Sequence, residues 1–161
     1  MTKRRILGFV SLGAVVLWCL FIWHFSLSPA ADSSVTSGEV TGTLNSFLEK
    51  ININLEFSGQ VIRKLAHFVE FFVLGLLLAL TLYLHSFPHV TPFALAISVL
   101  VAAVDECLQF LSPGRAPSLT DVLLDSLGAV CGIAAFLLLH LLCLALLRRR
   151  KKNLQKNQKK A

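Results

Sequence analysis

Ionisable side chains stand inside hydrophobic stretches of this chain, where a lipid bilayer would exclude them. They are one histidine and five acids: His67, Glu70, Asp105, Glu106, Asp121 and Asp125. A charge at the centre of a bilayer costs roughly 2.5–3.5 kcal/mol on insertion scales, so such residues usually pair with one another or line a cavity. A carboxylate beside an imidazole can act as a general acid or base. These residues therefore predict a functional site inside a membrane-embedded bundle of helices.

Four apolar stretches are long enough to position these residues as membrane-spanning helices. They run approximately over residues 6–27, 65–84, 91–111 and 120–147, and about 20 apolar residues cross roughly 30 Å of hydrocarbon. Of the 15 Lys and Arg, 11 lie within residues 3–5 and 148–160. Because Lys and Arg accumulate on the cytoplasmic side, the sequence predicts an all-α, polytopic fold of four transmembrane helices in residues 1–147, with both termini cytoplasmic. We expect the basic tail, residues 148–161, to be disordered.

The long loop, residues 28–64, is then predicted to face outward. Residues 30–42 are rich in Ser, Thr and Gly and predict a mobile link. Over about residues 43–56 the apolar positions follow helical spacing: Leu44, Phe47, Leu48, Ile51 and Leu55. This pattern predicts an amphipathic helix that lies on the outer leaflet.

The predicted topology places every intramembrane acid at a similar depth below the outer surface. Glu70 falls within about two turns of the start of its helix, and Asp105 stands seven residues before Ser112, roughly 10 Å deep at 1.5 Å per residue. Acids packed this closely cannot all be ionised without positive partners. We therefore predict one cavity open to the outer leaflet, with Arg115 at its rim and five residues around it: His67, Glu70, Asp105, Glu106 and Asp121.

Helical spacing indicates which side chains share a face. His67 and Glu70 are three residues apart, and Asp105 and Gln109 are four apart. Asp121 and Asp125 begin a stripe that continues to Gly128 and Gly132, a Gly-x-x-x-Gly pattern that lets another helix approach closely. The stripe predicts that the last span presses against the second and third.

Three runs together resemble the VanZ-like family of bacterial integral membrane proteins: FIWHFSLSP, RKLAHFVEFFVLG and AAVDECLQFLSPGRAPSLTDVLLDSLGAVCG. The resemblance covers most of the chain and implies a multi-pass protein of the bacterial plasma membrane. The name-giving member of the family accompanies glycopeptide resistance, particularly to teicoplanin, and the resemblance implies no settled activity. Two positions depart from the family pattern: Phe71 stands where Tyr is common, and Asp125 where many members have Asn.

Three classes of function remain open. The first is an enzyme acting on a lipid-linked envelope component, with catalytic His67, Glu70, Asp105, Glu106 and Asp121, and with substrate-binding Arg63, Lys64, Gln109, Arg115 and Asp125. Its metal-dependent variant would use His67 and the carboxylates, which suit Mg, Mn or Zn, although no specific motif indicates a metal. The second is a non-catalytic accessory or binding protein, and the third a proton- or ion-handling bundle, which is disfavoured because no matching polar residues continue inward.

Structural interpretations stand beside these functional ones. Arg63 and Lys64 are also suited to anchoring a helix at lipid phosphates, and Arg115 to pairing with an acid. The group of His67, Glu70 and Asp105 would also serve to hold the helices together, although such interhelical hydrogen bonds contribute only about 0.6 kcal/mol on average. Nucleic-acid binding is not expected, because no aromatic residues interleave the basic tail.

Overall fold

A computed structural model describes residues 3–50, 57–112 and 118–158 and contains only helices over these ranges. They are α1 (Lys3–Ser26), α2 (Ala30–Lys50), α3 (Gly59–Leu84), α4 (Val90–Phe110) and α5 (Leu119–Gln158). Four helical segments among the described residues are long and apolar enough to cross a membrane: α1, α3, α4 and the Leu119–Asn153 part of α5. The predicted all-α fold with four spans is confirmed.

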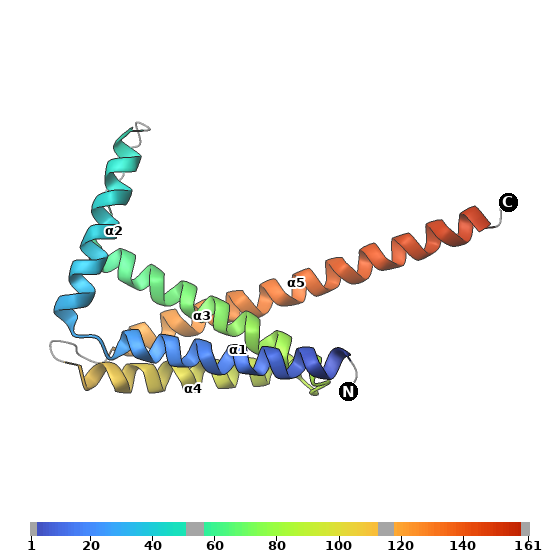
Figure 1. Ribbon diagram of the computed structural model, residues 1–161, viewed down its shortest axis with the longest axis horizontal. Coiled ribbons are helices and arrows are strands. Elements are labelled where there is room, and N and C mark those ends of the chain that lie inside the picture. Colours follow the sequence, from blue (N-terminus) through green and yellow to red (C-terminus); the bar gives the residue numbers. More distant parts are fainter. Residues whose placement is uncertain (1–2, 51–56, 113–117, 159–161) are drawn as a thin grey trace.

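The spans form one bundle, from which α2 and the last part of α5 project (Figure 1). α3 and α5 cross each other, and α1 and α4 run along the same bundle. α2 stands away from one end, while the last part of α5 projects beyond the other end, on the side where the N-terminus also lies. An even number of spans requires this placement of the two termini.

Glycines bring the backbones of α3 and α5 into direct contact. A Cβ atom at Gly128 would overlap the carbonyl oxygen of Phe68, and one at Gly132 would overlap that of Phe72. Gly75 on α3 meets the backbone of Ala129 in the same way. The predicted close approach along the Gly-x-x-x-Gly stripe is therefore confirmed, and it fixes the first half of α5 against α3.

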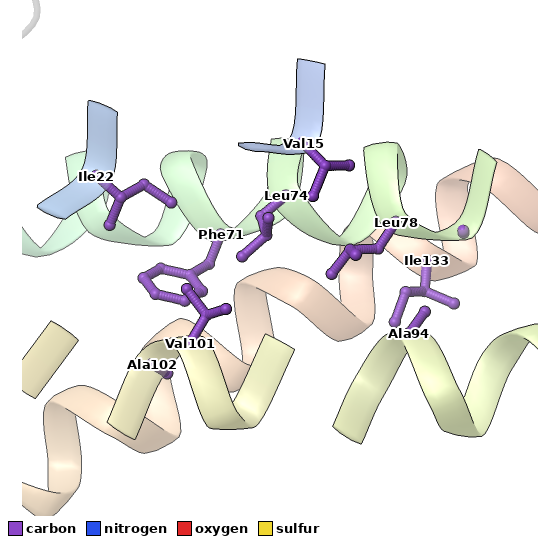
Figure 2. Packing of buried hydrophobic residues seen from close by; sticks show 10 residues of the cluster. Val15, Ile22, Phe71, Leu74, Leu78, Ala94, Val101, Ala102 and Ile133 are labelled. Atoms are coloured by element: carbon purple, nitrogen blue, oxygen red, sulfur yellow. The ribbon is translucent and has the colours of Figure 1, made fainter. Parts of the chain in front are cut away.

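The buried core lies between the spans, and on α3 it begins at Phe71, the residue after Glu70. Phe71 and Leu74 of α3 are fully buried, and Figure 2 shows them with Ile22 of α1 and Val101 of α4. Leu78 continues the same face of α3 deeper into the core. Large apolar side chains on the outer faces, such as Leu138, remain exposed in the bundle, as spans that face lipid require.

Residues 30–42 differ from the sequence prediction, because they belong to helix α2 rather than to a mobile link. The hydroxyls of Thr41 and Thr43 donate to the carbonyl oxygens of Ser37 and Glu39, at 2.6 and 2.9 Å. Such bonds to the preceding turn satisfy polar side chains inside a helix. The segment predicted as an amphipathic helix, about residues 43–56, forms the last part of α2 up to Lys50. Residues 51–56 lie outside the described ranges.

The basic tail also differs from the prediction, because α5 continues through it to Gln158 instead of becoming disordered. Leu, Lys, Arg and Gln are strong helix formers. Extending an existing helix avoids the cost of nucleating a new one, and positive charges near a helix C-terminus are favourable. Residues 159–161 lie outside the described ranges.

Candidate functional site

Asp105 joins the last turns of α1 and α4. Its side chain is fully buried. The hydroxyl of Ser26 donates to Asp105 Oδ1 at 2.5 Å, and the amide nitrogen of Gln109 donates to Oδ2 at 3.0 Å. Ser112 extends the network, because its hydroxyl donates to the carbonyl oxygen of Ser26 at 3.1 Å. Both carboxylate oxygens of Asp105 thus accept hydrogen bonds, one from α1 and one from α4.

His67 and Glu70 form a pair on α3, eight and eleven residues after the helix begins at Gly59. The distance between His67 Nδ1 and Glu70 Oε2 is 3.3 Å, and each side chain is 17% exposed. From α1, the indole nitrogen of Trp18 donates to the backbone oxygen of Glu70 at 2.9 Å. This bond fixes the middle of α3 against α1, next to the His67–Glu70 pair.

Three helices bring His67, Asp105 and Asp125 together. Each residue offers one nitrogen or oxygen that could bind a metal, and these three atoms all lie within 4.8 Å of one another. Asp125 is only 2% exposed. Its Oδ1 atom accepts no hydrogen bond from any residue that the structure describes. The sequence-predicted residues of α3, α4 and α5 therefore meet in one buried group, and Gln109 supports it from α4.

Glu106 and Asp121 stand beside this group with partners of their own. Asp121 Oδ1 lies 3.3 Å from the Lys64 ammonium nitrogen, and this pair is more exposed than the buried group. Glu106 accepts a hydrogen bond from the backbone nitrogen of Ser118, just before α5 begins. It also lines a groove between α4 and α5. Lys64 thus serves as a counter-charge for Asp121, and Glu106 connects α4 to the start of α5.

A cavity of about 360 Å³ opens between α1, α2 and α3. His67 and Glu70 line it together with Arg63. Its apolar walls include Phe21 and Phe25 of α1. Side chains of α2 close the cavity on the remaining side: Thr36, Ser37 and Val40. The arrangement offers one ionisable end and one apolar body to a bound molecule.

Arg115 lies outside the described residues, so its predicted place at the rim stays a prediction. Sequence reasoning did not single out Ser26, although the structure makes it the partner of Asp105. Its signal was its position within the run FIWHFSLSP, at the end of the first span. Serine is common where a span ends and a loop begins, so its presence there did not indicate a functional role.

The sequence of the chain matches a known protein family over most of its length. The model described as VanZ/LLP1 matches residues 11–141.

The chain belongs to the VanZ/LLP1 family.

The range matched to VanZ/LLP1 contains the buried group, the cavity and the glycine contacts, and it ends before the basic part of α5. Together with the four apolar helices, it makes this chain a multi-pass membrane protein. No curated protein and no solved structure matches the chain. The chemistry of this VanZ/LLP1 member must therefore be argued from its own residues.

Proposed function

We propose that this protein lies in the bacterial plasma membrane with both termini in the cytoplasm, and that it binds or acts on an anionic, lipid-linked component of the cell envelope. The cavity between α1, α2 and α3 is the observation that carries this proposal. Phenylalanine rings suit an acyl or prenyl chain. The Arg63 guanidinium suits a phosphate or diphosphate, because its planar fork matches these anions.

His67 and Glu70 would supply the chemistry if the protein is an enzyme. They line the same cavity as Arg63. An imidazole held 3.3 Å from a carboxylate can accept a proton from an attacking group and donate it to a leaving group. In the second candidate function the same pair only orients an anionic headgroup, and the protein acts as a non-catalytic binder that alters access to the envelope.

The core argues against the third class, a bundle that conducts protons. Beyond the site, the interior of the described bundle is filled by apolar residues such as Leu74, Leu78 and Ile133. Among the described residues three buried hydroxyls occur deeper, but those of Ser11, Thr81 and Ser98 donate to carbonyl oxygens of their own helices. A proton pathway needs a chain of polar groups that continues across the membrane.

The lipid proposal predicts a specific effect of Arg63→Gln. We expect the purified protein to retain a polyprenyl-diphosphate-linked sugar or an anionic phospholipid, and the variant to bind it at least about tenfold more weakly, because one charge-assisted contact is lost. The measurement is retention of the labelled lipid by the protein in detergent. Analysis of the same samples by mass spectrometry separates the two candidates, because only an enzyme converts the lipid to a product.

Lys50→Gln is the matched control for this experiment. It removes the same charge from the exposed end of α2, away from the residues that line the cavity. Equal losses of binding in both variants would mean that the lipid responds to general surface charge. Failure of the wild-type protein to retain any anionic lipid would overturn the proposal.

The proposed topology predicts opposite labelling of two engineered cysteines. Gly38 on α2 has open space around it, and Lys152 is exposed on α5. In a background without the native cysteines, we expect a membrane-impermeant maleimide to label Gly38→Cys in intact cells and Lys152→Cys only after permeabilisation. The reverse pattern would place the site on the cytoplasmic side.

The family resemblance suggests a phenotype for this binding. Teicoplanin, the drug linked to the name-giving member of the family, carries a lipid chain. A protein that binds lipid-linked envelope components in the outer leaflet would change how such a drug reaches its target. We therefore include reduced teicoplanin susceptibility of cells that express the protein in the proposed function.

A further inference from the structure

Asp125 is one of the buried ionisable groups that the proposed function does not use. Its side chain is 2% exposed and does not line the cavity. Oδ1 is fully buried and accepts no hydrogen bond from the described residues. An unsatisfied buried carboxylate is strongly unfavourable in a protein interior. A cation bound at this oxygen would remove that cost.

The surroundings of Asp125 resemble a metal-ligand set. His67, Asp105 and Asp125 come from three different helices, and one ligand atom of each lies within 4.8 Å of the others. Two ligands that each stand about 2.0–2.2 Å from a zinc ion are at most about 4.4 Å apart. A small adjustment of side-chain rotamers, of less than about 1 Å, would bring all three atoms onto one ion.

We propose that His67, Asp105 and Asp125 bind a divalent transition-metal ion, for which Zn²⁺ is the best fit. Imidazole nitrogen and carboxylate oxygen are both donors that Zn²⁺ takes, and three protein ligands leave a fourth position open for water or substrate. Among the described residues no lysine or arginine pairs with Asp105 or Asp125. The ion supplies the two positive charges that these carboxylates lack.

Neighbouring groups support the three ligands in the way metal sites require. Ser26 and Gln109 donate to the two oxygens of Asp105 and fix its orientation. Glu70 stands against a ring nitrogen of His67, and a carboxylate in that position commonly holds a metal-bound histidine and increases its basicity. Because His67 also lines the cavity, the ion would stand next to the bound lipid. In this respect the metal site rests on the proposed function and adds a metal ion to the same site.

Zinc content and thermal stability test the proposal on the full-length protein in detergent, without any lipid. After exposure to Zn²⁺ and removal of the excess, we expect about one zinc per chain and a higher Tm than in EDTA. Asp125→Asn should lower the affinity for zinc by at least about tenfold and abolish the Tm difference, since it replaces a charged ligand by a neutral one of the same size.

Glu49→Gln is the control, because it removes an exposed acid on α2 and leaves the three ligands and their surroundings intact. It should hold zinc as the wild type does. Equal zinc in the wild type and Asp125→Asn, or no zinc and no rise in Tm in the wild type, would overturn the proposal. In the latter case the acids are neutralised by protons instead. Lipid retention measured in EDTA tests the proposed function separately, so the two failures are distinguishable.

Discussion

Replacing Asp105 with alanine should reduce the free energy of unfolding by about 2–3 kcal/mol, the largest loss of stability we expect from a single substitution in the site. The fully buried carboxylate accepts hydrogen bonds from Ser26 of α1 and Gln109 of α4. The alanine variant loses both bonds, leaves the Gln109 amide without its acceptor and opens a small void. SDS titration in mixed micelles, followed by the fluorescence of Trp18 and Trp23, measures this loss.

Asp105→Asn separates the hydrogen bonds from the charge. Asparagine keeps the size of the side chain and an acceptor oxygen for Ser26, and Gln109 can turn its amide to offer its oxygen to the new NH₂ group. We expect this variant to lose less than half as much stability as the alanine variant. Similar losses in both would show that the charge of Asp105, rather than its hydrogen bonds, holds α1 to α4.

Glu70→Gln should abolish most of the function while leaving the protein in the membrane at its normal abundance. The substitution keeps the size of the side chain and removes the charge that faces His67 Nδ1 at 3.3 Å. We expect a fall of about 10²-fold in lipid turnover if the protein is an enzyme. For a binding protein, we expect a fall of about tenfold in lipid affinity. The lipid assay and quantification of the membrane-inserted protein are measured on the same cells.

Glu49→Gln provides the control for Glu70→Gln, because Glu49 is exposed on α2 and does not line the cavity. Its function should equal that of the wild type. If Glu70→Gln instead lowers the amount of protein in the membrane and the remaining protein has full specific activity, the His67–Glu70 pair has a structural role only. The ionisable group would then serve stability alone.

Most of the spans and several site contacts could be predicted because they follow from local rules. Hydropathy indicates each membrane crossing, and the depth of Asp105 follows from its distance to the end of its helix. The spacing of His67 and Glu70 predicts their contact, and the spacing of Gly128 and Gly132 predicts a close helix approach. These features depend only on helix geometry and on the thickness of the bilayer.

Other features depend on tertiary contacts that no local pattern encodes. Arg63 and Lys64 are neighbours in sequence, yet one lines the cavity and the other pairs with Asp121, since consecutive residues on a helix point about 100° apart. α2 was predicted to start near residue 43, because Ser, Thr and Gly usually indicate a link. In the structure, the side chain of Asn45 bonds to both backbone groups of Phe57 and ties α2 to the start of α3.

The glycine contacts between α3 and α5 determine from which direction a ligand can arrive. Backbone atoms of α3 and α5 touch at Gly75, Gly128 and Gly132 with no side chain between them. These two helices therefore cannot separate without losing the close-packed contact at all three glycines. α1 contacts α3 through side chains such as Trp18, which can change rotamer. We therefore expect the seam between α1 and α3 to separate first. A lipid would enter sideways through that seam, directly from the bilayer and without passing through water.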